Sequence, residues 1–252
     1  MNKVFEKLYE KLKRANQAAK LKMANYYGFE TVQELENYIL SEGALTDYTS
    51  PGKKTRKKAT RRVKVEVNVE APTDMVIAFD TTGSMKSYIA EVRKHVQETI
   101  GNLFENVPNL KLKIVAFGDY CDMKSSTEFG KAYQEIELTD DKEKLIQFVQ
   151  DAKDTGGGDT DEFYELVLHR IINETLWRTE ANKAILLIAD CEPHPVGYTL
   201  TPFVKNAQYD WLKEAKSAAE KNIKIDTLRI IPGTRWYAEL SMITNGSCMD
   251  FK

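Results

Sequence analysis

The stretch FDTTGSM, residues 79–85, places one carboxylate and two hydroxyls at alternate positions: Asp80, Thr82 and Ser84. It follows the apolar run MVIAF and precedes a helical pattern over 86–105. Alternate side chains of an extended turn can point at one centre, and Gly83 permits the bend. Three kinds of chemistry use such a stretch: a phosphotransfer nucleophile, a phosphate cradle and a cage for a metal ion.

Further oxygen donors follow two other segments. Asp190 ends the apolar run KAILLIAD, and Asp159 and Thr160 follow three glycines at 156–158. No Gly-Lys-Ser/Thr follows these glycines, which argues against a nucleotide-binding P-loop. Carboxylates and hydroxyls are the hard donors that Mg²⁺ prefers. The sequence therefore predicts a Mg²⁺ site, with Mn²⁺ or Ca²⁺ as alternatives, whose candidate ligands are Asp80, Thr82, Ser84, Asp159, Thr160 and Asp190.

The elements around these residues alternate between strands and helices. Two expected strands, 74–80 and 183–190, are continuously apolar, as is typical of parallel strands buried on both faces. The pattern predicts an α/β fold with an open, doubly wound, mostly parallel sheet and helices on both faces, which binds ligands beyond the carboxyl ends of its strands. Further strands are expected at 63–69, 110–120, 133–138, 223–231 and the C-terminus, and helices at 86–105, 140–153, 160–178, 206–222 and 235–244.

The N-terminal part differs in composition from the rest. Apolar residues at helical spacing predict a helix over 3–25, and a capping-box pattern at Thr31–Glu34 predicts a second helix to about residue 40. Residues 1–62 carry 14 basic and 7 acidic residues, which leaves 22 basic and 31 acidic residues for the remainder. We therefore expect a helical arm over 1–40, a basic linker over 41–62 and the α/β domain over 63–252.

The cysteine content and the apolar runs of the sequence indicate in which cellular compartment the protein works. Cys121, Cys191 and Cys248 are odd in number and far apart, which favours reduced thiols over a disulfide framework. No apolar run approaches the roughly 20 residues of a membrane helix, and the first 20 residues lack the apolar core of a signal peptide. We expect a cytoplasmic protein without a membrane span.

The motifs resemble those of the von Willebrand factor type A (vWA) domain and its metal-ion-dependent adhesion site. The family signature is D-x-S/T-x-S after the first buried strand, a Thr or Asp in a mid-chain loop and an Asp after a later strand. The stretch at 80–84, the loop GGGDTDE at 156–162 and Asp190 match these parts in order. VAFGDYCD (115–122) and LIADCEPH (187–194) look like the subset linked to alpha-type kinases. The resemblance covers roughly residues 72–252.

This resemblance implies a non-catalytic, metal-bridged protein-binding module. Thr82 and Ser84 would bind Mg²⁺ through their hydroxyls, and a partner's Asp or Glu would complete the coordination shell. Asp80 and Asp190 would act directly or through water. The mid-loop ligand would be Asp159 or Thr160, and the resemblance to the kinase-linked subset favours Asp159. Three carboxylates would then face the ion and weaken its pull on a partner's carboxylate.

Other interpretations compete with this one. DTTGS also resembles the D-K-T-G-T motif of aspartyl-phosphate enzymes, in which Asp80 would be the nucleophile of a Mg²⁺-dependent phosphotransferase or hydrolase. No second Asp closely follows Asp190, and a Thr replaces the motif's Lys. The basic segment 53–62 could bind nucleic acid. Ser84 could merely cap a helix, and the Cys-x-x-His spacing of Cys191 and His194 is a weak zinc signal.

Overall fold

The computed structural model describes residues 12–26, 31–33, 35–36, 71–199, 201 and 209–251. The chain divides into two compact units, Met1–Glu70 and Ala71–Lys252. In the first unit, helix α2 spans Gln17–Tyr26. The predicted strand over 63–69 and the linker over 41–62 lie outside the described residues, and the predicted domain boundaries stay predictions.

The helix predicted over 3–25 is not continuous. The chain leaves helical geometry at Ala15 and Asn16 before α2 begins. The Asn16 carbonyl accepts a hydrogen bond from the Lys20 N–H at 2.9 Å, so Asn16 stands where a helix cap belongs. Asn is among the residues preferred at that position, because its short polar side chain competes for backbone N–H groups.

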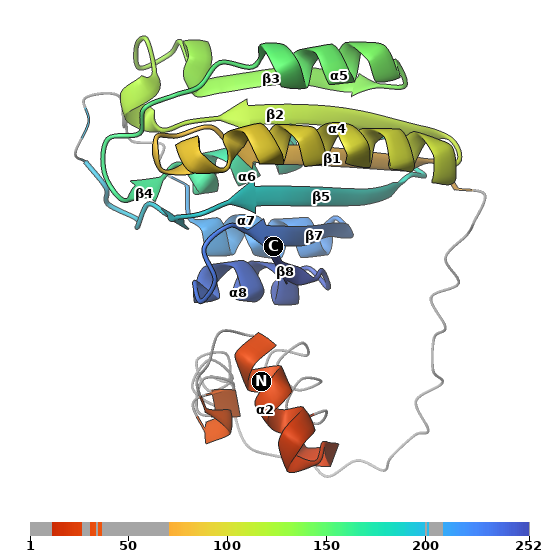
Figure 1. Cartoon of the computed structure of the whole chain (residues 1–252), viewed down its shortest axis with the longest axis vertical. Helices are drawn as coiled ribbons and strands as arrows, with labels where there is room; N and C mark the ends of the chain where they lie inside the picture. The colour runs from red at the N-terminus through yellow and green to blue at the C-terminus, as the bar shows by residue number, and fades with distance from the viewer. Residues whose placement is uncertain are drawn as a thin grey trace, which may run out of the picture. The chain divides into compact units, whose positions relative to one another are not determined.

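The second unit is an α/β fold around a six-stranded sheet, whose strands lie side by side in Figure 1. The strand order is β3-β2-β1-β5-β7-β8, and every neighbouring pair is parallel except β2 and β3. This confirms the predicted mostly parallel sheet, with the polar strand β3 at one edge. The strands are β1 (Thr73–Asp80), β2 (Leu110–Phe117), β3 (Tyr133–Thr139), β5 (Asn182–Ala189), β7 (Ile223–Arg229) and β8 (Cys248–Asp250).

Helices cover both faces of this sheet, as predicted (Figure 1). Apolar side chains of α4 (Ile89–Asn106) and α5 (Lys142–Asp151) share one core with those of β1 and β2. On the other face, Trp236 of α8 (Arg235–Ile243) contacts Tyr164 of α6 (Tyr164–Glu174). The same Trp236 ring meets Trp211 at the start of α7 (Trp211–Glu220) edge-on.

Several predicted helix ends are wrong, and each has a local cause. Residues Ser84–Ser87 form a 3-10 turn, η1, so that α4 begins only at Ile89. The helix predicted over 160–178 is shorter, because Asp161–Glu162 form strand β4, which pairs with β6 (Glu192–Pro193). At the other end Thr175 is extended. Helix α7 begins at Trp211, where the Asp210 side chain accepts the Leu212 N–H.

The sheet order reverses between β1 and β5. From β1 the chain continues to β2 on one side, whereas β5 leads to β7 on the other. Such a switch point opens a crevice at the carboxyl ends of the two strands. Asp80 is the last residue of β1 and Asp190 directly follows β5, so both acids lie at this crevice. Among the described residues, no helix combines the length and apolar character needed to cross a bilayer.

Candidate metal centre

The Asp80 carboxylate is fully buried and held by two hydrogen bonds. Its Oδ1 accepts the Thr82 N–H at 2.7 Å, and its Oδ2 accepts the Tyr164 hydroxyl at 2.5 Å. Burial raises the pKa of Asp80 to about 7; these hydrogen bonds offset part of the effect, and the negative charge of Asp190 adds to it. The two donors thus fix the orientation of the Asp80 carboxylate at the end of β1.

The two hydroxyls of the motif face each other. Thr82 Oγ1 and Ser84 Oγ lie 3.2 Å apart, and Ser84 Oγ lies 3.8 Å from Cys191 Sγ. The interpretation of Ser84 as a helix cap is wrong, because η1 begins after Gly83 and has no side-chain cap. The caps of α4 likewise involve no side chain. The Ser84 hydroxyl is therefore directed at the neighbouring loop and not at a helix end.

The end of β5 brings a second acid to the same place. Asp190 is buried, and its Oδ1 accepts the Cys191 thiol at 3.2 Å. Its Oδ2 is a buried atom with no hydrogen-bond partner among the described residues. The Cys191 N–H donates to the Tyr164 hydroxyl at 3.2 Å, so this phenol joins the ends of β1 and β5.

Glu162 is a third acid of this cluster, and our sequence analysis missed it. It is 2% exposed, and its Oε2 has no partner among the described residues. Burial and the nearby Asp80 charge raise its pKa to about 10, and the Thr82 hydroxyl offsets part of this. A Cβ at Gly157 would lie 2.7 Å from Glu162 Oε1 and 3.4 Å from Thr82 Cβ, which places the two side chains against one glycine. The only sequence signal was an acid in the first turn of the helix predicted over 160–178.

Backbone contacts fix the glycine-rich loop beside β1. The Thr155 N–H donates to the Thr81 carbonyl at 2.9 Å, and the Gly83 N–H donates to the Gly156 carbonyl at 3.0 Å. The carboxylate of Asp122 accepts the N–H groups of Gly156 and Gly157 at 2.8 and 3.0 Å. Asp122 therefore holds this loop in position.

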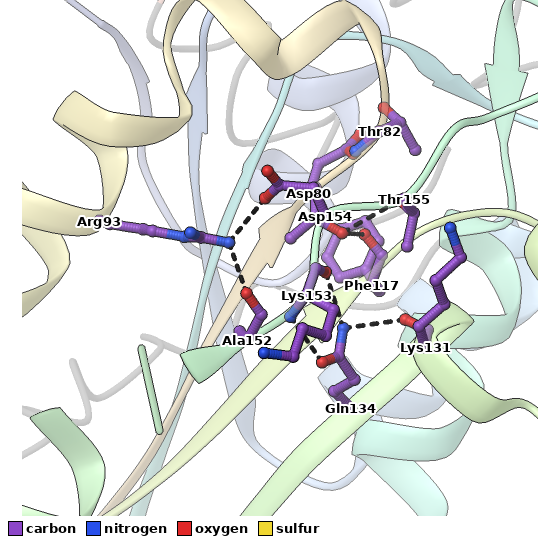
Figure 2. Close-up of polar contacts among 11 residues, drawn as sticks. Asp80, Thr82, Arg93, Phe117, Lys131, Gln134, Ala152, Lys153, Asp154 and Thr155 are labelled. Carbon is purple, nitrogen blue, oxygen red and sulfur yellow. Dashed lines mark hydrogen bonds and ion pairs between the residues drawn. The ribbon is translucent and has the colours of Figure 1, made fainter. Parts of the chain in front are cut away.

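Side chains from two neighbouring elements anchor the start of the same loop, as Figure 2 shows. Arg93 of α4 reaches the Ala152 carbonyl and the Asp154 carboxylate, both at 2.7 Å. Gln134 of β3 accepts the Lys153 N–H at 2.7 Å and donates to the Lys153 carbonyl at 2.9 Å. The glycine loop is thus part of a preformed site.

The two mid-loop candidates lie elsewhere. Asp159 is exposed, and its Oδ2 accepts the Tyr198 hydroxyl at 2.7 Å. One of its oxygens lies within 4.8 Å of donor atoms on Asp119 and His194. Thr160 is exposed. The described contacts therefore group Asp80, Thr82, Ser84 and Asp190 with Glu162 and place Asp159 in a neighbouring cluster, while the ligand role of each predicted residue stays a prediction.

The donor set of the first cluster fits a divalent cation. Carboxylate and hydroxyl oxygens are the ligands that Mg²⁺ takes, usually with some water retained. Two buried carboxylate oxygens, one each from Glu162 and Asp190, have no partner in the described part of the chain. Buried polar atoms are normally paired, and a bound divalent cation would give both oxygens a partner. Burial is the main cause of the raised pKa values of Asp80 and Glu162, and a bound cation would favour the ionised form of both acids.

Comparisons with known proteins agree with this fold. The family model for the von Willebrand factor type A domain matches residues 74–251. A protein of Acanthamoeba polyphaga mimivirus described as ariadne-like RING finger protein R811 is 23% identical over 196 residues, which cover 71% of this chain and 18% of the viral protein. The crystal structure of the pilus adhesin SpaC from Lactobacillus rhamnosus GG matches with a TM-score of 0.50 at 16% identity, over 72% of this chain and 28% of the adhesin. The chain thus spans less than a third of either relative.

Proposed function

The chain belongs to the family of von Willebrand factor type A domains, and on that basis we propose that it is a metal-dependent protein-binding module and not an enzyme. The metal centre would be an adhesion-type site at the ends of β1 and β5. We further propose that the protein works in the cytoplasm and belongs to the subset of the family linked to alpha-type kinases. Mg²⁺ is the proposed ion.

One observation carries this proposal: the Thr82 and Ser84 hydroxyls follow β1, and Asp190, at the end of the neighbouring strand β5, accepts the Cys191 thiol that Ser84 contacts. Thr82 and Ser84 would hold the ion through their hydroxyls, which lie 3.2 Å apart. Glu162 and Asp190 would neutralise it with their unpartnered oxygens. When bound, Mg²⁺ would supply a Lewis-acidic position for a carboxylate of the partner.

The environment of Asp80 favours a positioning role over nucleophilic attack. A nucleophilic carboxylate needs an oxygen that the substrate can reach. Both oxygens of Asp80 accept hydrogen bonds, one from the Thr82 N–H and one from the Tyr164 hydroxyl, and the side chain is fully buried. We therefore assign Asp80 the task of orienting the loop that carries Thr82.

The charge of the site affects how it would recognise a partner. If Asp80, Glu162 and Asp190 all ionise around one dication, simple addition leaves about −1, which weakens the attraction for an outside carboxylate. If Glu162 keeps its proton, the sum is zero and the ion attracts a carboxylate more strongly. The surrounding loops would contribute more to recognition in the first case than in the second.

The test uses the full chain and a matched pair of serine variants. Ser84 and Ser87 are both exposed in η1, but only Ser84 faces the cluster. Isothermal titration with Mg²⁺ should show one site in the wild type and in Ser87→Ala, with an affinity at least about tenfold lower in Ser84→Ala. Equal Mg²⁺ affinities in all three proteins would contradict the metal role.

Partner recognition is tested with a Mn²⁺-loaded protein and a peptide array. Each peptide carries one Asp or Glu, and a matched peptide carries Asn or Gln. Retention should require both the metal and the carboxylate, and EDTA should abolish it. If the protein retains peptides equally well without the metal and without the Asp or Glu carboxylate, the proposed metal bridge is contradicted.

Two further assays address the alternative functions. A covalent phosphoryl adduct on Asp80 after incubation with acetyl phosphate or ATP would overturn the binding-module proposal in favour of a phosphotransferase. Strongly salt-dependent binding to nucleic acid that disappears on deletion of residues 1–62 would favour the nucleic-acid adaptor.

A further inference from the structure

A second cluster of metal-ligand side chains lies beside the first one. Asp119 follows β2 at the start of the short 3-10 turn η2 (Tyr120–Asp122), His194 follows β6, and Asp159 belongs to the glycine loop. One ligand atom from each lies within 4.8 Å of the other two. We propose that Asp119, Asp159 and His194 form a separate site for a transition-metal dication such as Zn²⁺.

The chemistry of the three ligands separates this site from the Mg²⁺ site. His194 Nε2 lies 2.7 Å from Asp119 Oδ1, and both side chains are at most 2% exposed. Asp159 is exposed and closes the cluster on its solvent side. One imidazole with two carboxylates is a set that Zn²⁺ and its neighbours in the first transition row bind, whereas Mg²⁺ prefers oxygen alone.

Unpartnered buried atoms point to a ligand in this place. Asp119 Oδ2 and His194 Nδ1 are buried and have no hydrogen-bond partner among the described residues. A cation between the two side chains would take Asp119 Oδ2 and His194 Nε2 as ligands, because His194 turns Nε2 and not Nδ1 toward Asp119. The exposed Asp159 marks the side from which it would arrive.

Tyr198 orients two of the three ligands. Its ring stacks on the imidazole of His194 with 3.7 Å between the centroids, and its hydroxyl donates to Asp159 Oδ2 at 2.7 Å. Outer groups of this kind fix the orientation of metal ligands, and losing one typically costs 10–100-fold in affinity. Tyr198 is therefore a positioning residue of the proposed site.

The Cys-x-x-His pair is divided between the two clusters. The thiol of Cys191 contacts Ser84 and Asp190 in the first cluster, whereas His194 pairs with Asp119 in the second. The segment from the glycine loop to β4 contributes to both clusters, because Asp159 lies near Asp119 and His194, whereas Glu162 and Thr82 lie against Gly157. The second site goes beyond the proposed function, and either site can be lost while the other is retained.

The experiment titrates the full chain with Co²⁺, which reports nitrogen and carboxylate ligation through its visible absorption bands, and then displaces it with Zn²⁺. The decisive variants are His194→Gln and Asp159→Asn. The controls are Asp140→Asn, which changes another exposed acid, and Ser87→Ala, which changes an exposed hydroxyl that belongs to neither cluster. Co²⁺ affinity should fall at least about tenfold in both decisive variants and stay unchanged in both controls.

Unchanged Co²⁺ spectra and affinities in His194→Gln and Asp159→Asn would overturn the proposal. So would a loss of the spectrum in Ser84→Ala, because the absorbing ion would then occupy the first site. If His194→Gln fails to fold, Asp159→Asn decides alone, since that side chain is exposed. Mg²⁺ affinity measured on His194→Gln separates the two proposals: His194 is not among the predicted Mg²⁺ ligands, so this affinity should equal that of the wild type whatever happens to Co²⁺.

Discussion

The hydroxyl of Tyr164 connects the two strand ends that form the first cluster. It donates to Asp80 Oδ2 at 2.5 Å and accepts the Cys191 N–H at 3.2 Å. Tyr164 is fully buried at the start of α6, with its ring edge-on to Phe117 and tilted against Trp236. A helix on one face of the sheet therefore fixes the spacing between β1 and β5 at their carboxyl ends.

Removing this hydroxyl should loosen the site and destabilise the domain. In Tyr164→Phe the rings still pack, but one oxygen of Asp80 and the Cys191 N–H lose a partner. We expect the free energy of unfolding to fall by about 1–3 kcal/mol and Mg²⁺ affinity to fall with it. Urea unfolding and isothermal titration measure the two effects. Tyr88→Phe, which changes an exposed tyrosine at the start of α4, should alter neither; equal results for both variants would contradict the bridging role.

Glu162→Gln should separate metal binding from folding. The pKa of Glu162 is raised to about 10, so the metal-free protein carries it protonated at pH 7 and an amide changes its stability little. Mg²⁺ must compete with this proton, so binding to the wild type should release a proton and weaken as the pH falls. In the variant the proton that Glu162 releases should be absent, so fewer protons should be released than in the wild type, and the affinity should be at least about tenfold lower.

Proton release is measured by titrating Mg²⁺ in two buffers with different ionisation enthalpies. Glu192→Gln is the matched control, because Glu192 is an exposed acid of the two-stranded sheet that also contains Glu162. The control should keep the wild-type affinity and proton count. Identical proton counts for Glu162→Gln and the wild type would remove Glu162 from the metal centre.

The central sheet and the motif on β1 could be predicted because their signals are local. Strands β1 and β5 are apolar over most of their length, as strands buried on both faces must be. The alternate spacing of Asp80, Thr82 and Ser84 needs only one extended turn. The polar edge strand β3 was likewise visible from its own composition.

Glu162 and the Asp119–His194 pair could not be predicted in the same way, since their positions depend on segments that are distant in the sequence. Glu162 lies in the two-residue strand β4, whose pairing with β6 exists only in the folded chain. From sequence it looked like an ordinary acid in the first turn of a helix. Asp119 and His194 are 75 positions apart in the sequence. They meet because the segments that follow β2 and β6 come together in the folded chain.

Gly157→Ala should distort the metal centre, whereas Gly233→Ala should not. Both glycines have positive φ, +68° and +100°, which costs an L-residue of order 1–3 kcal/mol. At Gly233 a Cβ would meet nothing within 4 Å, but at Gly157 it would lie 2.7 Å from Glu162 Oε1. Both variants should therefore be less stable to urea, and only Gly157→Ala should also lose Mg²⁺ affinity. A normal Mg²⁺ affinity in Gly157→Ala would contradict the position assigned to Glu162.

Glu165 should make the stability of the domain depend on pH. It is fully buried in the first turn of α6, where its Oε1 accepts the Tyr120 hydroxyl at 2.8 Å, and burial raises its pKa from 4.5 to about 7. Because the folded chain holds this proton more tightly than the unfolded chain, the stabilisation is complete below about pH 4.5 and is lost as the pH rises through 7. This difference between the pKa values of Glu165 in the folded and unfolded chain corresponds to about 3 kcal/mol.

Glu165→Gln cannot ionise, so urea unfolding from pH 5 to 8 should show the variant gaining stability relative to the wild type as the pH rises. Glu174→Gln, at the exposed end of the same helix, should run parallel to the wild type; a parallel course for Glu165→Gln would show that its carboxyl group does not titrate in this range.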